Sequence, residues 1–326
     1  MKGIKQSMLC LGIATLAAII SPAQVVAQEF PSKPIKILIP FPPGGGTDFV
    51  SRLVGNKLAE ITKWNVILEN KPGAGGNLAI AEAAKANPDG YTLVMGQTDN
   101  MMLGPWLYDN IGYDSVKSFA PVVQVSVTPG AVVSATNSEI KNAADLLKKS
   151  KSPEGVKWAT AGNGTFGHLL GEQYKKISGG NITHIPYKGA SPALTDLMGG
   201  HVDVAVLSVA SVLPQIRTGK LNPVAVSTSK RSPQLPDTPT LQEGGVPGID
   251  ASIWVGMFAP AGTPPDVIKK LNAAVNQVLA SQDVKDKITA GGVSVVGGKS
   301  EDFAEFVKKD FARWGAIAKE SGVKVQ

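Results

Sequence analysis

Short apolar runs alternate along the chain with longer segments whose apolar residues recur every three to four positions. The short runs are typical of strands, and the periodic segments of helices packed on one face. The runs predict strands at Ile35–Phe41, Asn65–Glu69, Tyr91–Gly96, Ala131–Thr136, Val156–Thr160, Ile182–Tyr187, Val202–Ser208 and Asn222–Thr228. The periodic segments predict helices at Thr47–Ile61, Leu78–Ala86, Ala143–Lys149, Thr165–Ile177, Pro192–Met198, Ser211–Arg217, Pro264–Ala280 and Ser300–Glu320. Strands that alternate with helices indicate an α/β protein with mostly parallel sheets.

The order of these elements predicts two lobes. Residues 28–125 and 229–326 together are expected to form the first lobe, and residues 126–228 an inserted second lobe. The chain would pass between the lobes twice, near residues 124–127 and near residues 226–228. These two crossings would form a two-stranded hinge.

The N-terminal segment has the pattern of a signal peptide. Lys2 and Lys5 precede an apolar stretch at Met8–Ile20, and the small residues that end at Ala27 fit a cleavage site before Gln28. The apolar stretch is too short to cross a bilayer, which takes about 20 residues. We therefore expect residues 1–27 to be removed during export to the periplasm.

Composition narrows the class of protein further. The one cysteine, Cys10, would leave with the signal peptide, so the mature protein would depend on its hydrophobic core rather than on disulfides. The formal net charge is +6, but the lysines and arginines are scattered and aromatic residues make up 6% of the chain. A nucleic-acid-binding surface would need a basic stripe with stacking rings, so we expect no nucleic acid partner.

Two glycine-rich loops follow the first two predicted strands, at residues 42–48 and 70–77. Glycine lets the backbone approach a ligand closely, and the start of a helix presents unpaired N–H groups. Loops at the carboxyl ends of neighbouring parallel strands converge on one crevice. The pair therefore predicts an anion-binding cradle of main-chain N–H groups. A nucleotide phosphate is disfavoured, since Gly46 is followed by Thr-Asp instead of the Lys and Ser/Thr of a P-loop.

A third glycine-rich loop, at residues 162–167, matches the pattern G-x-G-x-x-G after a strand and before a helix. A dinucleotide site would need Asp or Glu about 20 residues later, but the next strand ends in residues 184–188 without an acid. We expect no cofactor here and interpret Gly164 and Thr165 as a helix start that faces an anion. His168, one turn later, is interpreted either as a ligand contact or as a packing residue.

Patterns typical of catalysis or of metal binding are missing from the sequence. No two histidines stand at i, i+4, which disfavours a metal site, and no G-x-S-x-G motif supplies a nucleophile. We therefore expect no catalytic residue. Asp203, among β-branched neighbours, is either a turn residue or a cleft carboxylate for a ligand's amino group.

Several motifs give the chain a family resemblance. They are Phe30–Ile35, Pro40–Asp48, Asn70–Gly76, Pro88–Leu93, Tyr187–Gly189, Gly219–Leu221, Lys230–Ser232, Leu235–Thr240 and Ala259–Pro264. With these motifs the mature chain resembles the solute receptors of tripartite tricarboxylate transporters, also called the Bug family. The resemblance implies a monomeric, two-lobed periplasmic binding protein of the Venus flytrap type. Such a protein closes on a small organic carboxylate and delivers it to membrane permease subunits.

By matching position, the resemblance also implies a set of ligand-binding residues. The first lobe would contribute Pro43, Gly44, Gly45, Gly46, Thr47, Asp48, Pro72, Gly73, Ala74, Gly75 and Gly76. The second would contribute Gly164, Thr165, His168, Tyr187, Asp203 and Ser208. Residues 104–106 and the pair Leu207-Ser208 depart from the family pattern. These departures leave open whether the ligand is a di- or tricarboxylate, an aromatic acid or an acidic amino acid.

Two other functions remain as alternatives. One is an exported, hydrolase-like enzyme that uses Asp48, His168 or Asp203, although no nucleophile–base pair is legible in the sequence. The other is a ligand sensor that serves a signalling kinase. A receptor without chemistry of its own fits the glycine loops best.

Overall fold

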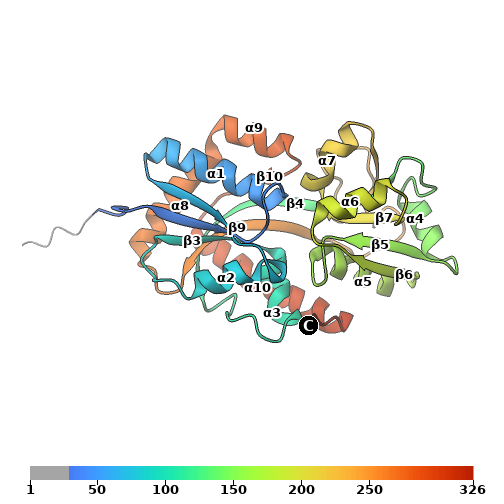
Figure 1. Ribbon diagram of the computed structural model, residues 1–326, viewed down its shortest axis with the longest axis horizontal. Coiled ribbons are helices and arrows are strands. Elements are labelled where there is room, and N and C mark those ends of the chain that lie inside the picture. The colour runs from blue at the N-terminus through green and yellow to red at the C-terminus, as the bar shows by residue number, and fades with distance from the viewer. Residues whose placement is uncertain (1–28, 326) are drawn as a thin grey trace, which may run out of the picture.

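The computed structural model describes residues 29–325, so the expected signal peptide lies outside the described residues. It has the predicted α/β architecture in two lobes, with helices on both faces of the sheet (Figure 1). The strands are β1 Ile35–Ile39, β2 Val66–Asn70, β3 Thr92–Gln97, β4 Phe119–Ala135, β5 Val156–Thr160, β6 Ile182–Pro186, β7 Val204–Ser208, β8 Leu221–Val226, β9 Ser252–Pro260 and β10 Ser294–Val295. The α-helices are α1 Gly46–Thr62, α2 Asn77–Ala84, α3 Gly104–Leu107, α4 Ala143–Ser150, α5 Phe166–Ser178, α6 Ala190–Met198, α7 Val209–Arg217, α8 Pro265–Ala280, α9 Gln282–Ala290 and α10 Ser300–Ser321. A 3₁₀ turn, η1 Ala74–Gly76, precedes α2, and a π-helical segment, η2 Thr98–Leu103, precedes α3.

The strands form one mixed sheet with the order β2-β1-β3-β9-β4-β7-β5-β6, while β8 and β10 also pair with β4. In the first lobe, β1 is parallel to β2 and to β3. In the second lobe, β5 is parallel to β6 and to β7. The long strands β4 and β9 pair antiparallel to each other, and β4 extends from one lobe into the other (Figure 1). Each lobe therefore has its own parallel ladder, and antiparallel pairs link the two.

The two long central strands differ most from the sequence-based prediction. The prediction placed a strand only at 131–136, where β4 ends, and none at β9. Most residues of both strands are buried, because helices cover both faces of the sheet. A strand buried on both faces has no alternation of polar and apolar residues, so it is recognised only by an uninterrupted apolar run, and Gln124 and Pro129 interrupt that run in β4 as Gly256 does in β9.

The segment at residues 229–251 lies beside the second lobe. The N–H of Val226 donates to the carbonyl of Pro239 at 2.9 Å, and the N–H of Leu241 donates back to Val226 at 3.0 Å. At the end of the segment, the N–H of Ala251 donates to the carbonyl of Ser227 at 3.0 Å. The chain then returns to the first lobe through β9, which pairs with β3.

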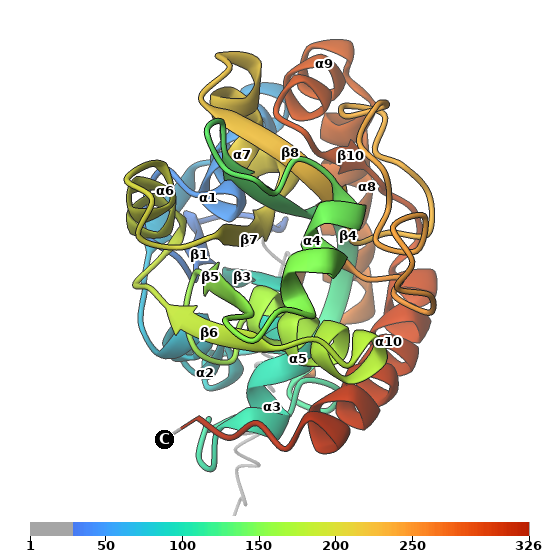
Figure 2. The ribbon, with the colours of Figure 1, turned by 90° about the vertical axis from the view of Figure 1, so that its right-hand side faces the viewer.

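In each lobe the strands bury alternate side chains toward two helical layers. Ile37 of β1 packs with the core under α1, α8 and α9, whereas its neighbour Leu38 packs with the core under α2 and α10. In the second lobe, Trp158 of β5 faces the core under α4 and α5, and Ala159 faces α6 and α7. Figure 2 shows these pairs of helices on opposite sides of β5–β7.

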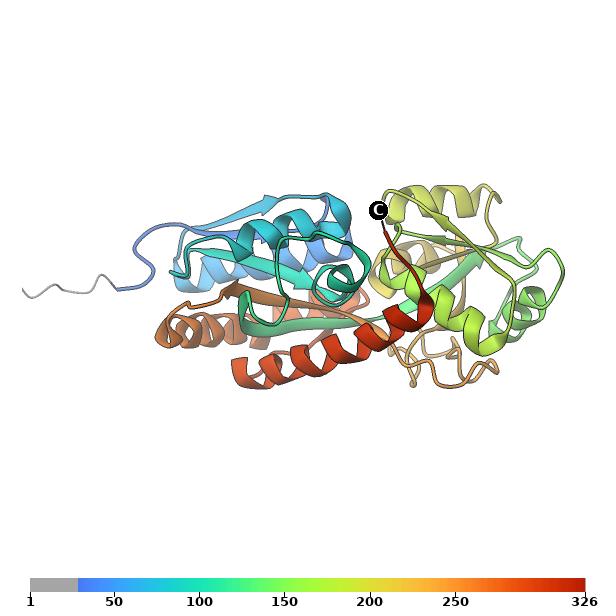
Figure 3. The same ribbon diagram turned by 90° about the horizontal axis from the view of Figure 1, so that it is seen from below.

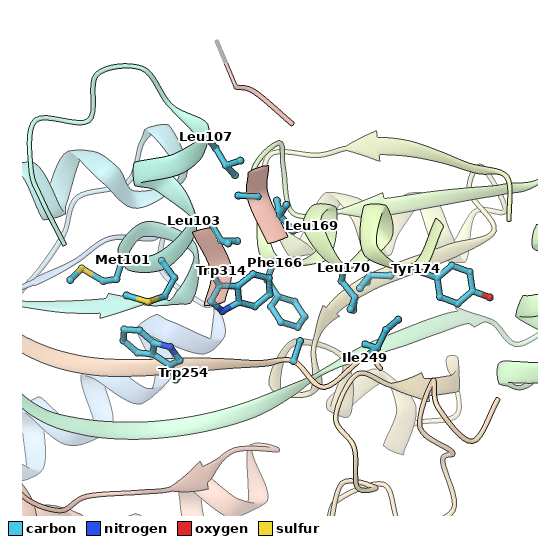
Figure 4. Packing of buried hydrophobic residues seen from close by; sticks show 14 of the residues in the cluster. Met101, Leu103, Leu107, Phe166, Leu169, Leu170, Tyr174, Ile249, Trp254 and Trp314 are labelled. Carbon is cyan, nitrogen blue, oxygen red and sulfur yellow. The ribbon is translucent and has the colours of Figure 1, made fainter. Parts of the chain in front are cut away.

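One hydrophobic core continues across the junction between the lobes (Figure 4). Phe166, the first residue of α5, packs its ring edge-on against Trp314 of α10, with the ring centroids 5.8 Å apart. Leu107 of α3 belongs to the same cluster. Helix α10 runs along the first lobe to the junction (Figure 3). The start of α5 is thus packed directly against the first lobe.

Candidate functional site

The first glycine-rich loop is held in shape by the carboxylate of Asp48. This buried side chain accepts the N–H of Gly44 at 3.0 Å and Nδ2 of Asn70 at 2.8 Å. It also forms an ion pair with Nε of Arg52 at 2.9 Å. The carboxylate of Asp48 is thus engaged inside the protein, so a ligand contact at this residue would be made by its backbone N–H at the start of α1. It positions the loop and balances the charge of Arg52.

The start of α1 leaves backbone donors available. Its N-cap, Gly45, has no side chain, and among residues 29–325 no side chain makes a capping hydrogen bond at this helix end. The first N–H groups of a helix have no partner within the helix, so they carry a partial positive charge. Pro43 and Gly44 are exposed, whereas Thr47 is buried. The loop therefore presents main-chain donors beneath an exposed tip.

The second glycine-rich loop has an unusual backbone, since four consecutive residues have a positive φ. Gly73, Ala74, Gly75 and Gly76 have φ values of 133°, 48°, 66° and 94°. L side chains are disfavoured in this region of backbone conformation, and Ala74 is the one non-glycine residue of the four. At Gly76 an added Cβ would lie 2.7 Å from Nδ2 of Asn100, so space also requires glycine. The tip formed by Pro72, Gly73 and Ala74 is exposed.

The two loops lie side by side, because β1 and β2 are adjacent and parallel. Asn70, the last residue of β2, donates from Nδ2 to the carbonyl of Phe41 at 2.8 Å and to Asp48. Asn70 thus ties the second loop to the first. As in the first loop, no side chain within the described range caps α2, whose N-cap is Gly76. The N–H groups of Gly76 and Asn77 donate to the carbonyls of Gly73 and Ala74, so the available donors of this loop lie in its tip, beside the start of α1.

The second lobe brings Ser208 to the first loop. A Cβ added at Gly46 would lie 3.6 Å from Oγ of Ser208 and 3.4 Å from Cβ of Ala210. Ser208 is the N-cap of α7, and its Oγ accepts the N–H of Ser211 at 3.2 Å. The start of α1 and the start of α7 therefore face each other across the junction.

The third glycine-rich loop forms the start of α5. Oγ1 of Thr165 donates to the carbonyl of Gly162 at 2.8 Å, and the N–H of Gly164 donates to Nδ1 of His168 at 3.1 Å. An added Cβ at Gly164 would lie 3.6 Å from Cε2 of Tyr108. The hydroxyl of Tyr108 also lies 3.2 Å from the Cβ position of Gly75. Tyr108 therefore lies between the second and third loops.

His168 stacks on His184, with the ring centroids 3.7 Å apart and the planes 9° from parallel. Burial lowers the pKa of His168, and burial together with the charge of His168 lowers the pKa of His184 to about 4. Both rings are therefore neutral at pH 7. Since Nδ1 of His168 accepts a hydrogen bond from Gly164, its proton lies on Nε2, which is a donor.

Asp203 does not lie with the other predicted residues. It precedes β7, whereas Ser208 ends this strand at the junction. Oδ2 of Asp203 accepts the N–H of Lys157, which stands near the start of β5, at 2.7 Å. Asp203 also lines an open surface pocket of about 490 Å³ with Glu139 and Lys148. Because parallel strands put their carboxyl ends at one edge, a residue before β7 lies at the opposite end from the loops.

Tyr187 follows β6, the outermost strand of the second lobe. Its hydroxyl donates to Oδ2 of Asp196 on α6 at 2.6 Å. Burial, together with this hydrogen bond and the charge of Asp196, raises the pKa of Tyr187 to about 12. The hydroxyl of this predicted ligand contact is thus engaged by α6.

The sequence reasoning missed a polar group that follows β3. Oγ1 of Thr47 donates to Oε1 of Gln97, and Nε2 of Gln97 donates to Oδ2 of Asp99 at 3.1 Å. Asp99 in turn accepts the N–H of Phe166 at 2.8 Å. Burial raises the pKa of Asp99 to about 6, although hydrogen bonds from Phe166 and Gln97 oppose the rise. The signal was present, because the polar residues 97–100 follow a third strand parallel to the first two.

Metal binding and membrane insertion find no support in residues 29–325. No cluster of three or more histidine, cysteine, aspartate or glutamate side chains is arranged there to hold an ion. No helix in that range combines the length with the apolar character that crossing a membrane requires.

The chain matches one protein family and is similar in sequence to proteins of known bacteria. Residues 50–323 match the profile of the tripartite tricarboxylate transporter family receptor, TctC. The chain is 33% identical over 306 residues to protein BugT of Bordetella pertussis, covering 93% of this chain and 94% of BugT. It is 34% identical over 307 residues to a protein encoded in the tcbD–tcbE intergenic region of Pseudomonas sp. strain P51, covering 93% of this chain and 91% of that protein.

Solved structures of similar sequence have the same fold. Rpa4515 of R. palustris, solved with adipate, superimposes with a TM-score of 0.84 at 31% identity, covering 90% of this chain and 99% of that chain. The periplasmic binding protein BugD superimposes with a TM-score of 0.81 at 33% identity, covering 91% of this chain and 100% of BugD. MatC of Rhodopseudomonas palustris, with bound malate, superimposes with a TM-score of 0.80 at 30% identity, covering 89% of this chain and 100% of MatC.

Proposed function

Since the chain belongs to the tripartite tricarboxylate transporter receptor family, whose members are periplasmic solute-binding proteins and not enzymes, we propose that it is a carboxylate receptor. It binds one small organic carboxylate between its two lobes. It then delivers the ligand to the membrane subunits of a tripartite transporter. The signal peptide at residues 1–27 directs it to the periplasm.

The observation that carries this proposal is the start of α1 with available N–H groups, next to the tip of the second glycine-rich loop. The loops that precede α1 and α2 lie at one edge of the β1–β2 ladder and are joined by Asn70. A carboxylate accepts hydrogen bonds from such groups and is favoured by the partial positive charge of both helix ends. Gly45, Gly46 and Thr47, with Gly73, Ala74 and Gly75, are the proposed donors. The N–H groups of Gly44 and Gly76 are taken by Asp48 and by the carbonyl of Gly73, so these two glycines shape the loops, as Pro43 and Pro72 shape the exposed tips.

The energy of such a cradle is sufficient for a transport receptor. Hydrogen bonds to a charged group contribute about 1.5–3 kcal/mol each. Four or five of them, together with apolar contact, offset an association cost of roughly 4–15 kcal/mol and support micromolar binding, about −8 kcal/mol. Main-chain donors also avoid the desolvation of a buried arginine or lysine.

The second lobe closes the site. Ser208 provides a hydroxyl group near the first lobe, and Nε2 of neutral His168 provides a further donor, whereas the hydroxyl of Thr165 is donated to Gly162 and shapes the third loop. The lobes correspond to the division at β4 and β9, and the segment at residues 229–251 moves with the second lobe because it is hydrogen-bonded to β8. Closing of the lobes around a ligand is the signal that the membrane subunits read.

Matched pairs of ligands test the proposal. Calorimetry with the mature chain compares mono- and dicarboxylates with their neutral amides, which have nearly the same shape. We expect micromolar binding of at least one carboxylate and at least a hundredfold weaker binding of its amide, since the amide has no charge for the helix ends to stabilise. Equal binding of acid and amide would contradict the cradle. The compound should be recovered unchanged, and its conversion would indicate an enzyme.

A further inference from the structure

The first backbone N–H of α5 is taken by a carboxylate of the protein itself. Asp99, in η2 of the first lobe, accepts the N–H of Phe166 with Oδ1 at 2.8 Å. Phe166 is the first residue of α5, and the preceding Thr165 directs its hydroxyl to Gly162 instead of to the helix. A helix N-terminus attracts negative charge, and here the charge comes from the opposite lobe.

Asp99 is held in place by residues of the proposed site. Nε2 of Gln97 donates to Oδ2 of Asp99 at 3.1 Å, and Thr47 of α1 donates to Oε1 of Gln97. Thr47 belongs to the first glycine-rich loop. The side chain of Asp99 thus has a fixed position, connected on one side to the carboxylate cradle and on the other to α5.

The charge of Asp99 is balanced by dipoles and not by a cation. Its hydrogen-bond partners are an amide side chain and a backbone N–H. In the part of the chain that the structure describes, no lysine, arginine or histidine forms an ion pair with it, whereas Asp48 pairs with Arg52. Each oxygen of Asp99 accepts one bond, so each has capacity for a second donor.

We propose that Asp99 determines specificity, by keeping a second ligand carboxylate away from the N-terminus of α5 and thereby selecting ligands with one carboxylate and a neutral or cationic far end. The inference rests on the proposed function, because the cradle must hold the first carboxylate. A dicarboxylate would place its second negative charge beside Asp99, and the backbone donor that could neutralise it is already used. An ammonium group at the same place would find a carboxylate with free acceptor capacity.

Calorimetry at pH 7.5 tests this with matched triplets of acids, each with four to eight carbon atoms. A triplet consists of a dicarboxylate, the monocarboxylate of equal length and the ω-amino acid of equal length, for example adipate, hexanoate and 6-aminohexanoate. For the unaltered mature chain, we expect the ω-amino acid and the monocarboxylate of the best-fitting length to bind at least tenfold more tightly than the dicarboxylate. Juxtaposed like charges at an interface cost enough for such a ratio.

Asp99→Asn is the main variant. The asparagine keeps the shape and one acceptor oxygen for the N–H of Phe166 but removes the charge. We expect the dicarboxylate to gain at least tenfold in affinity, and the ω-amino acid to lose a similar factor. Asp203→Asn removes the same charge at the far end of β7 and is the matched control, which should leave the ratio between the three ligands unchanged. Circular-dichroism melting establishes that both variants fold.

The outcomes separate the proposals. If the unaltered chain binds the dicarboxylate best and Asp99→Asn leaves the order unchanged, the specificity role is overturned while the receptor function stands. If Asp99→Asn changes the affinity for all three ligands by one common factor, Asp99 only links the lobes, and the specificity role is likewise overturned. If no acid in any triplet binds, the proposed function fails, and this inference fails with it.

Discussion

The first lobe and the second lobe each present a glycine-rich turn between a strand and a helix, but the two turns differ in what their helix starts contact. At α1 the loop's own carboxylate, Asp48, folds back to Gly44 in front of the helix and is paired with Arg52. At α5 a carboxylate from the other lobe, Asp99, takes the first N–H of the helix itself. Similar local sequences thus leave one helix start available for a ligand and fill the other. The difference depends on a residue that belongs to neither turn.

The largest effect is expected from breaking the cradle of the first lobe with Gly75→Val. Gly75 has a φ of 66°, and an added Cβ would lie 3.2 Å from the hydroxyl of Tyr108. A β-branched residue is strained at this φ, so the loop would change conformation and turn its N–H groups away. We expect carboxylate affinity by calorimetry to fall at least a hundredfold, about 2.7 kcal/mol.

Gly219→Val is the control for this prediction. Gly219 has a φ of 70° with open space around it, so it gives the same backbone strain away from the loops. The affinity of the Gly219→Val variant for carboxylate should equal that of the unaltered chain. If both variants lost binding equally, the effect would come from general destabilisation and the cradle would be in doubt.

A smaller effect is expected from Asp48→Ala, which tests whether the carboxylate in the first lobe shapes the loop. The substitution removes the acceptor for Gly44 and Asn70 and leaves Arg52 without its ion-pair partner. Losing hydrogen bonds to a buried charged group costs about 1.5–3 kcal/mol, which should appear in urea unfolding. Ligand affinity should fall about tenfold, since the loop is only loosened. A stable variant that loses all binding would show instead that Asp48 contacts the ligand.

The charge of Asp99, which faces the second-lobe turn from the first lobe, is expected to respond to pH. The pKa of Asp99 is raised from 3.8 to about 6, so the folded state binds this proton more tightly than the unfolded state. The stabilisation from protonated Asp99 is fully present below about pH 4 and is lost as pH rises through 6. Tyr108, whose pKa is raised by burial and by the charge of Asp99, stays neutral in this range. The pKa of His184 is lowered to about 4, so this ring stays neutral over most of the range, and burial also lowers the pKa of His168.

We therefore expect the free energy of unfolding of the unaltered chain to fall, relative to Asp99→Asn, by about 1–2 kcal/mol between pH 4.5 and pH 7.5. The discrimination against dicarboxylates should weaken below pH 6 in the unaltered chain only. Parallel pH profiles for the two proteins would show that Asp99 does not titrate in this range.

The smallest effect is expected from Asp203→Ala. Asp203 accepts the N–H of Lys157 at the end of the second lobe that is distant from both turns. Carboxylate affinity should change by less than about twofold, and stability by about 1 kcal/mol or less for one half-exposed hydrogen bond. A selective loss of binding for amino acids would return Asp203 to the ligand site.

The sequence predicted much of the fold, but not the two central strands β4 and β9. Strands with short uninterrupted apolar runs and most amphipathic helices were found near their true bounds, and Val156–Thr160 coincides with β5, whereas α9 was missed. The strand β9 was missed and β4 was recognised only at its end, because neither has the short uninterrupted apolar run of β5: Gln124 and Pro129 interrupt β4, and Gly256 interrupts β9. The two turns of the first lobe were correctly expected to be neighbours, since parallel strands place their carboxyl ends together.

The sequence by itself determined the local backbone of this protein. Glycines at residues 73, 75 and 76 allow a run of positive φ that other residues resist, and this preference depends only on the residue and its immediate neighbours. Only the tertiary structure decided which helix start keeps its donors. Asp99 and Phe166 are 67 positions apart, and their hydrogen bond forms because η2 and α5 pack together across the junction. Such pairings depend on the packing of whole elements, which no local pattern of residues encodes.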